Sequence, residues 1–411
     1  MSNNSNIRIL IAGGGTGGHV FPAIAIADAF KALHPQTEFL FVGALGKMEM
    51  ERVPKAGYRI EGLNIAGFHR PLNTRNAWRN ISFPYKLLTS IWRAKSLVRR
   101  FAPDVVVGTG GYVSGPVVRA AQRKGIPTLI QEQNSHAGVT NKLLGAKANL
   151  VCVAYDGMEA YFPAKRIAFT GNPVRQDLLH IDNLREEGLR HFGLDSQKKT
   201  VVVLGGSLGA RTLNTAMMAG TQLLATHPEL QVIWQCGSFY SHLCGESETA
   251  QLPNVQVHAF IDRMDLLYAV SDVIVSRAGA LSISELCLVA RPVVLVPSPN
   301  VAEDHQTKNA LSLVEKGAAR LVRDADAEAQ MLTEVLHVLH NESLAFSLTE
   351  SIRQLARPQA AQQIAKAIET LVGDINVKKP KKKKKDKNVR VTKQQLRDEW
   401  PAIIQKTRKI Q

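Results

Sequence analysis

The chain has 411 residues, of which 45% are hydrophobic and 21% are charged, with a formal net charge of +16. This length and apolar fraction predict two domains, since single cores stop growing near roughly 250–300 residues. No apolar run approaches the roughly 20 residues that span a bilayer. The start, MSNNSNIRIL, lacks the basic and apolar parts of a secretory signal. The four cysteines have neither metal-finger nor CxxC spacing. We therefore expect a cytoplasmic protein without a membrane span, disulfide framework or zinc site.

The positive charge is concentrated at the C-terminal end. Residues 376–411 contain fourteen Lys/Arg and three acidic residues, so the rest of the chain is close to balanced. A run such as VKKPKKKKKDK is typical of a solvated extension. Adhesion to anionic lipid is a second interpretation, and contact with nucleic acid or the ribosome is a third. The charge gives no reason to expect a nucleic-acid-binding surface on the folded part.

In chain order, short apolar strands alternate with amphipathic helices, and this alternation restarts near Thr200. The pattern predicts an α/β fold with two parallel sheets joined at residues 171–173. The expected domains are residues 1–172, residues 173–350, a helical segment at 351–373 that packs back, and the basic tail at 374–411. The strands are predicted at IRILIAG, EFLFVG, DVVVGTG, PTLIQEQ, NLVCVA and IAF, then TVVVLGG, QVIWQCG, VQVHAF, DVIVSRAG, PVVLVP and ARLV.

Clusters of glycine follow several of these strands, at residues 13–18, 108–115 and 205–209. Glycine lets backbone amides approach a ligand closely, and the N-terminus of the next helix favours phosphate. The first cluster formally satisfies GxGxxG. A dinucleotide site also requires a carboxylate at the end of the second strand, which here reads FVGAL. An NAD-dependent enzyme is therefore disfavoured, as is a P-loop NTPase, because GxxxxGK[ST] is absent from these loops.

Seven motifs in order, GGGTGGHVFP, GGYVSGP, EQN, GNPVR, GGSLGAR, RAGALSISE and EDHQTKNA, closely resemble the MurG family across about 310 residues. Members transfer N-acetylglucosamine from UDP-GlcNAc to undecaprenyl-pyrophosphoryl-MurNAc-pentapeptide during peptidoglycan synthesis. The resemblance implies a GT-B fold, in which two Rossmann-like domains with parallel sheets face an interdomain cleft. It also implies a peripheral enzyme on the cytoplasmic face of the cell membrane, without a cofactor.

The resemblance further implies a donor site, mainly on the second domain. Glu285 would hold the ribose, Ser207 the diphosphate, Ile261 the uracil and Gln306 the sugar. The full set of donor residues is Thr16, Gly17, Gly18, Asn134, Arg175, Ser207, Ile261, Ala280, Leu281, Ser282, Ile283, Ser284, Glu285 and Gln306. Each of these positions would otherwise be a helix cap or a packed core residue, and Ala280 and Ile283 are the most open to that interpretation.

The chemistry implied is an inverting transfer, in which an acceptor hydroxyl attacks the anomeric carbon as UDP leaves. His19 follows the first glycine loop at a helix start, where the dipole disfavours its protonated form. We expect His19 to be the general base. The alternative is that His19 caps the loop or binds acceptor phosphate, with Glu132 or a water as the base.

The acceptor is amphiphilic, and residues 65–101 suit it because they mix aromatic, apolar and basic residues without any acid. We expect this stretch to meet an anionic membrane surface; the alternative is a core-packing helix with a basic outer face. Gly110, Gly111, Tyr112 and Ser114 would cradle the acceptor pyrophosphate. The apolar members of the stretch include Trp78, Ile81, Phe83, Leu87, Leu88, Ile91 and Trp92.

Three further features qualify this interpretation. Asp324 and Asp326 spell DxD, which we interpret as a solvated turn with a helix cap, so no bound metal is expected. Gln131 and His305 stand where family members usually have His and Gln. Other functions left open are a lipid galactosyltransferase, a UDP-GlcNAc 2-epimerase, and a non-catalytic binding protein with the same fold.

Overall fold

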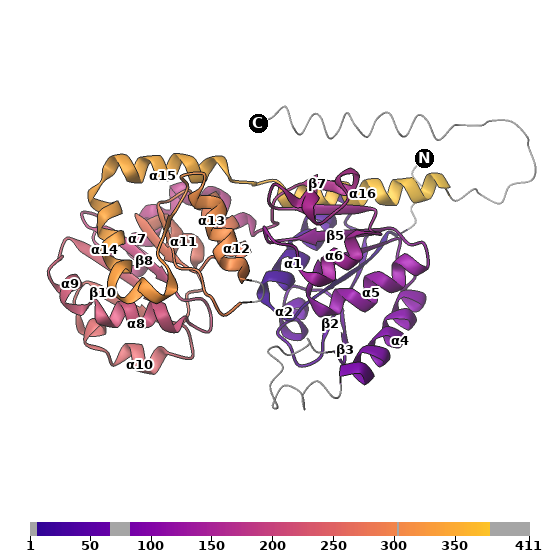
Figure 1. The fold of residues 1–411 in the computed structure, drawn as a ribbon, viewed down its shortest axis with the longest axis horizontal. Helices are drawn as coiled ribbons and strands as arrows, with labels where there is room; N and C mark the ends of the chain where they lie inside the picture. The colour runs from indigo at the N-terminus through magenta and orange to yellow at the C-terminus, as the bar shows by residue number, and fades with distance from the viewer. Residues whose placement is uncertain (1–5, 66–82, 302–303, 379–411) are drawn as a thin grey trace, which may run out of the picture.

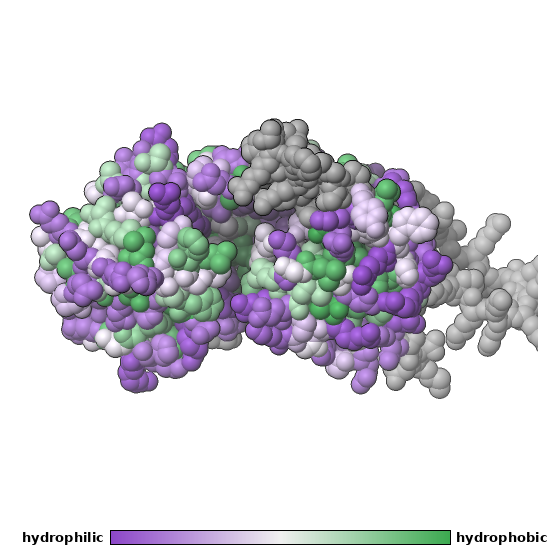
Figure 2. All heavy atoms as spheres, turned by 90° about the horizontal axis from the view of Figure 1, so that it is seen from below, coloured by the Kyte–Doolittle hydropathy of each residue, from purple (hydrophilic) through white to green (hydrophobic). Residues whose placement is uncertain are grey.

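The computed structural model describes residues 6–65, 83–301 and 304–378. Figure 1 shows two lobes side by side, each built on one parallel sheet with helices on both faces. The two predicted parallel sheets are therefore confirmed. Figure 2 views the molecule from below and shows a groove between the lobes.

The first lobe is a seven-stranded sheet in the order β3-β2-β1-β4-β5-β6-β7. Its strands are buried on both faces, which is why they read as continuous apolar runs. Ile9 and Ile11 face the core beneath α1, whereas Leu10 and Ala12 face the core beneath α4 and α5. The elements are β1 (Arg8–Gly13), α1 (Gly17–Leu33), β2 (Glu38–Ala44), α2 (Glu49–Lys55), β3 (Ile60–Leu63), α4 (Phe83–Phe101), β4 (Val105–Gly110), α5 (Gly111–Arg123), β5 (Thr128–Glu132), α6 (Val139–Gly145), β6 (Leu150–Val153) and β7 (Ile167–Phe169).

The second lobe is a six-stranded sheet in the order β10-β9-β8-β11-β12-β13. One face packs on α8 and α14, and the other on α11, α12 and α13. The elements are α7 (Arg185–Phe192), β8 (Lys199–Leu204), α8 (Arg211–Ala219), α9 (Thr221–Ala225), β9 (Leu230–Gln235), α10 (Ser241–Gly245), β10 (Val255–His258), α11 (Met264–Val270), β11 (Val273–Ser276), α12 (Ala280–Val289), β12 (Val293–Leu295), α13 (His305–Val314), β13 (Arg320–Leu321), α14 (Ala327–His340) and α15 (Glu342–Gln354).

The chain passes between the lobes twice, after β7 and again after α15. The two crossovers touch, since a Cβ on Gly171 would lie 2.5 Å from the Cβ of Arg357. After the second crossover α16 (Ala360–Lys378) packs on α1, where Ile364 and Ile368 complete the first lobe's core. In Figure 1 this helix runs back over the first lobe. The sheet edges formed by β3 and β10 lie away from these crossovers.

Candidate active site

The first glycine loop places His19 in the opening turn of α1, beside the end of β4. The ring Nδ1 lies 3.0 Å from the carbonyl oxygen of Thr109 and 3.1 Å from Oε1 of Gln133. Both partners accept hydrogen bonds, so Nδ1 carries the proton. The other ring nitrogen, Nε2, then holds a lone pair, as a general base requires.

The surroundings of His19 favour its neutral form. Burial lowers the pKa of the imidazole, and the charge of Glu132 together with the bonds to Gln133 and Thr109 only partly opposes this shift. His305, at the start of α13 in the second lobe, lowers the pKa further. The imidazole is therefore unprotonated at neutral pH and able to take a proton.

The other residue weighed as a base, Glu132, has a different role in the structure. Its carboxylate is buried, and both oxygens accept hydrogen bonds from within the first lobe. Oε1 accepts from the backbone amide of Asn134 at 3.0 Å, and Oε2 accepts from Asn141 Nδ2 at 2.9 Å and from the backbone amide of Gly138 at 3.1 Å. Glu132 therefore anchors the loop after β5, and its role as the alternative base stays a prediction.

The expected acceptor cradle divides in two. Gly110, Gly111 and Tyr112 lie against the first glycine loop: a Cβ on Gly111 would be 2.2 Å from the carbonyl oxygen of Gly14, and the Tyr112 ring packs beside Gly15. Ser114 instead is fully buried, and its hydroxyl donates to the carbonyl oxygens of Ala12 and Gly110. Ser114 thus shapes the turn, and its contact with pyrophosphate stays a prediction.

Sequence reasoning missed Glu49, which closes the first loop from below. Although it opens the polar helix α2, its side chain is fully buried. Oε1 accepts from the backbone amides of Gly15 at 3.1 Å and Ala44 at 3.0 Å. Among the described residues Oε2 has no hydrogen-bond partner. The carboxylate missing from the end of β2 is thus supplied five residues later, but it binds the loop's own backbone.

In the second lobe the donor residues gather around α12. Glu285 accepts hydrogen bonds from Arg175 Nε and from the hydroxyl of Tyr268, each at 3.3 Å. Burial raises the pKa of the Glu285 carboxyl, and the charge of Arg175 opposes that shift. The structure therefore brings together two residues predicted separately from GNPVR and RAGALSISE. Tyr268 was not predicted, because on α11 it resembles an ordinary core position.

The remaining donor residues occupy three kinds of environment. Ser207 is exposed in the second glycine loop, and Gln306 holds the backbone amide of Ser298 through Oε1 at 2.9 Å. The other seven are described by their burial. Thr16 is exposed, Gly17, Gly18, Leu281 and Ser282 are half-buried, and Ile261 and Ala280 are buried.

Two asparagines connect the lobes at the inner end of the groove. Asn309 of α13 accepts from the backbone amide of Ser135 at 3.0 Å and donates to Oδ1 of Asn134 at 3.3 Å. Asn172, on the first crossover, donates to Ser284 Oγ of α12 at 3.0 Å. Asn134 and Ser284 are thus engaged in contacts between the lobes, where sequence reasoning expected donor contacts.

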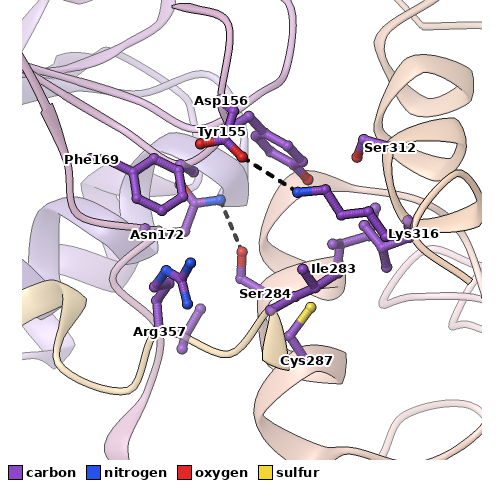
Figure 3. A pocket seen from close by; sticks show the side chains of 15 residues that line it. Tyr155, Asp156, Phe169, Asn172, Ile283, Ser284, Cys287, Ser312, Lys316 and Arg357 are labelled. Carbon is purple, nitrogen blue, oxygen red and sulfur yellow. Dashed lines mark hydrogen bonds and ion pairs between the residues drawn. The ribbon is translucent and has the colours of Figure 1, made fainter. Parts of the chain in front are cut away.

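Behind these contacts lies a cavity of about 60 Å³ between the two crossovers (Figure 3). Ile283 and Ser284 line it, so α12 presents these two side chains to the crossovers. Lys316 lies 3.4 Å from Asp156 across it. Ile283 is 2% exposed and packs at this position, and its contact with the donor stays a prediction.

The DxD sequence does not form the expected solvated turn. Asp324 forms an ion pair with Arg277 and accepts a hydrogen bond from Thr212 Oγ1 at 3.0 Å. Asp326 precedes α14 without a side-chain capping bond and pairs with Arg323 at 2.6 Å. Within residues 6–65, 83–301 and 304–378, no group of three or more His, Cys, Asp or Glu residues is placed to hold a metal ion.

Comparisons with known proteins agree with this geometry. Residues 9–153 match the glycosyltransferase family 28 N-terminal domain, and residues 200–372 match the glycosyltransferase family 28 C-terminal domain. The chain is 53% identical over 364 residues to the UDP-N-acetylglucosamine--N-acetylmuramyl-(pentapeptide) pyrophosphoryl-undecaprenol N-acetylglucosamine transferase of Bacteroides fragilis, covering 88% of this chain and 95% of that protein. The protein of the same name from Flavobacterium psychrophilum is 47% identical over 365 residues, covering 89% and 98%.

Solved structures extend the likeness to the fold. The crystal structure of Acinetobacter baumannii MurG is 30% identical with a TM-score of 0.70, covering 89% of this chain and 99% of that one, which confirms the expected GT-B-type fold. UDP-GlcNAc 2-epimerase from Neisseria meningitidis is 12% identical with a TM-score of 0.61, over 89% of this chain and 100% of that one, and so shares the fold alone. The chain therefore belongs to the MurG family of UDP-N-acetylglucosamine--N-acetylmuramyl-(pentapeptide) pyrophosphoryl-undecaprenol N-acetylglucosamine transferases.

Proposed function

We propose that this chain is an inverting hexosyltransferase that moves N-acetylglucosamine from UDP-GlcNAc to the C4 hydroxyl of undecaprenyl-pyrophosphoryl-MurNAc-pentapeptide. Membership of the family supports the reaction. The observation that carries the mechanism is the contact of His19 Nδ1 with two acceptors, the oxygens of Thr109 and Gln133, which assigns the proton to Nδ1. This arrangement leaves Nε2 as a proton acceptor at the mouth of the first glycine loop.

In the proposed reaction the acceptor oxygen forms a bond to the anomeric carbon, while the bond from that carbon to the UDP phosphate oxygen breaks. The hydroxyl proton passes to His19 Nε2, and the electron pair leaves with UDP. Negative charge then grows on the diphosphate, where backbone amides around Ser207 and the guanidinium of Arg175 stabilise it. Glu285 would accept from the ribose hydroxyls when they displace its long bonds to Arg175 and Tyr268.

The outer face of α4 supports a contact with an anionic membrane surface. Tyr85, Leu88 and Trp92 are 70%, 58% and 74% exposed, whereas Leu97 and Val98 on the opposite face are buried. A groove at the far end of α4 is lined by cations from α4 and the end of α5: Lys95, Arg99, Arg123 and Lys124. Exposed aromatic residues beside cations suit the headgroup region of a bilayer. The core-packing interpretation therefore holds for one face of α4, and the membrane contact is proposed for the other face.

We place the enzyme peripherally on the cytoplasmic face of the membrane, where a lipid-linked acceptor and a soluble nucleotide sugar meet. Among the described residues no helix combines the length and apolarity needed to cross a bilayer. Part of the predicted membrane stretch, including Trp78 and Ile81, lies outside the described residues, as does most of the basic tail. No nucleic-acid partner is proposed.

The decisive experiment incubates the protein with labelled UDP-GlcNAc and the polyprenyl-pyrophosphoryl muramyl-peptide. Label should pass into the organic phase only when the acceptor is present. A 2-epimerase, the alternative with the same fold, would instead convert UDP-GlcNAc without acceptor. Label that stays in the aqueous phase with acceptor present would reject the proposed transfer.

A further inference from the structure

A chain of buried amide side chains runs from His19 to the second lobe. It passes through Gln133 and Gln131 at the end of β5 and through Asn172 on the first crossover, and it ends at Ser284 of α12. The three amide residues are each 2% exposed or less. Buried amides are costly unless every group finds a partner, so such a chain is a specified feature of the fold.

Every link of this chain runs in the same direction. His19 Nδ1 donates to Gln133 Oε1 at 3.1 Å, and Gln133 Nε2 donates to Gln131 Oε1. Gln131 Nε2 then donates to Asn172 Oδ1 at 2.9 Å. Asn172 Nδ2 donates to Ser284 Oγ at 3.0 Å, and that hydroxyl donates to the carbonyl oxygen of Ala280 at 2.9 Å. Hydrogen bonds aligned in this way polarise and strengthen one another.

The direction is fixed by the backbone at several points. Gln133 Nε2 also donates to the carbonyl oxygen of Thr109 at 2.7 Å, and Asn172 Nδ2 also donates to the carbonyl oxygen of Gln133 at 3.0 Å. Turning either amide over would set oxygen against oxygen. With the amides so fixed, Gln133 can only present its oxygen to His19.

We propose that Gln133, Gln131 and Asn172 are positioning residues that hold His19 in the Nδ1-protonated tautomer and connect this state to the first turn of α12. The proposal rests on the proposed function, in which His19 is the base. Its links cross from the first lobe to the second, so the chain is complete only while α12 stands against the crossover. Since α12 carries Glu285, the same helix serves the proposed nucleotide site.

The position of Gln131 suits this role in a way that can be tested. A link in the chain must accept one hydrogen bond and donate another, which a neutral histidine can also do. Gln131→His should therefore preserve the chain, whereas Gln131→Met keeps a similar volume and removes both bonds. Gln231, a buried amide on β9 bonded to Asp195 and Thr200, provides the control through Gln231→Met.

The tautomer can be read directly from the nitrogen resonances of the full-length protein labelled with 15N-histidine, at about pH 8, where imidazoles are neutral. The His19 signals are identified by their loss in His19→Asn. We expect a protonated Nδ1 and an unprotonated Nε2 in the wild type and in Gln131→His. In Gln131→Met we expect a larger share of the Nε2-protonated tautomer, because the carbonyl oxygen of Thr109 then opposes that tautomer without the support of the chain. A wild type with the proton on Nε2 would overturn the proposal.

Kinetics supply the second measurement. We expect Gln131→Met to lower kcat about tenfold to hundredfold while the KM for UDP-GlcNAc changes less than about threefold. Gln131→His should stay close to the wild type, and Gln231→Met should lower stability but not kcat. Equal kcat values for Gln131→Met and the wild type would reject the proposed role of the hydrogen-bonded chain. If Gln131→Met does not fold, Asn172→Asp replaces the last amide donor of the chain, which also bonds the carbonyl oxygen of Gln133, with a second acceptor. Unchanged kcat in that variant would equally reject the proposed hydrogen-bonded chain.

The two proposals fail in different ways. A wild type that holds the expected tautomer but transfers no sugar would reject the proposed function but not the positioning role of the amide side chains. A wild type that transfers sugar with the opposite tautomer would reject the positioning role but not the proposed function.

Discussion

The two glycine loops have similar sequences but are held in different ways. In the first lobe, buried side chains fix the loop: Glu49 holds the amide of Gly15, and Thr109 Oγ1 donates to the carbonyl oxygen of His19 at 2.8 Å. In the second lobe, backbone packing fixes the loop, with Gly209 seated against the carbonyl oxygen of Cys236. Its Ser207 remains exposed.

This difference matches two different tasks. A base must point one nitrogen at one hydroxyl, so the first loop is surrounded by directional hydrogen bonds. A diphosphate accepts from many amides at once, so the second loop needs exposed backbone more than oriented side chains. Two loops of similar shape can thus serve different purposes: one orients a catalytic side chain, and the other binds a diphosphate.

The largest effect is expected from removing the proposed base of the first loop. His19→Ala should lower kcat about 10²- to 10⁴-fold, the usual contribution of a general base. The affinity for UDP-GlcNAc, measured by calorimetry, should stay near the wild-type value because the nucleotide is proposed to bind mainly to the second lobe. Near-normal turnover would remove His19 from the mechanism.

The pH dependence of the wild type follows from the same residue. Because burial lowers the pKa of His19, the base stays unprotonated until the pH falls below the ordinary histidine range. Activity should therefore be lost only as the pH falls through this lowered pKa, and kcat/KM measured against pH would show it. An acidic limb above the ordinary histidine value would contradict the burial argument.

Two glycine substitutions should separate the tasks. Gly110 has φ +107, and a Cβ there would lie 2.7 Å from His19 Nδ1; Gly209 has φ +91, and a Cβ there would lie 2.2 Å from the carbonyl oxygen of Cys236. We expect Gly110→Ala to lower kcat about tenfold or more and Gly209→Ala to raise the KM for UDP-GlcNAc by a similar factor. Gly157→Ala is the control, since φ is +74 there and no atom lies within 4 Å. Identical kinetic defects at Gly110 and Gly209 would contradict the claim that the two loops have different functions.

Removing Glu49 tests how the first loop is held. Glu49→Ala should lower the free energy of unfolding by about 2–3 kcal/mol, because two buried amides lose their acceptor and a cavity remains. Urea denaturation measures the change. Glu51→Ala, two residues on, removes only an exposed pair with Lys55 and should leave the stability nearly unchanged. Equal losses in the two variants would contradict the role of Glu49.

A smaller effect extends the comparison to the outer surfaces of the lobes. Trp92→Asp on α4 should weaken binding to anionic vesicles about tenfold, without changing turnover on a short-chain soluble acceptor. Phe346→Asp on α15 of the second lobe removes a side chain that is 69% exposed and should change neither. Vesicle sedimentation measures both. Undiminished binding by Trp92→Asp would exclude this face of α4.

No change is expected on adding EDTA. Asp324 is already paired with Arg277, and amides with Arg175 take the place of a cation in the proposed donor site. Initial rates with and without EDTA should agree within about twofold, since metal-assisted transfer would lose far more. A loss of activity that Mg²⁺ restores would show that the second lobe needs a metal ion to bind the diphosphate.

The sheets could be predicted because buried parallel strands are apolar on both faces, so runs such as TVVVLGG stand out from polar helices. The loops could be predicted because each glycine cluster follows a strand. The partners of the polar core could not. Gln133 and Asn309 look like ordinary polar residues until the fold brings in partners more than 100 residues away. Glu49 was missed because its helix is polar in sequence, which gives no sign that this carboxylate is buried.

The return of α16 to the first lobe sets the order in which the protein can be completed on the ribosome. Strand β1 and helix α1 emerge first, but the apolar face they share is closed by Ile364, Ile368 and Leu371. The first lobe therefore waits, partly uncovered, while the whole second lobe is translated. A nascent chain stalled before these residues would expose an apolar surface to chaperones and proteases, whereas the second lobe could already be folded.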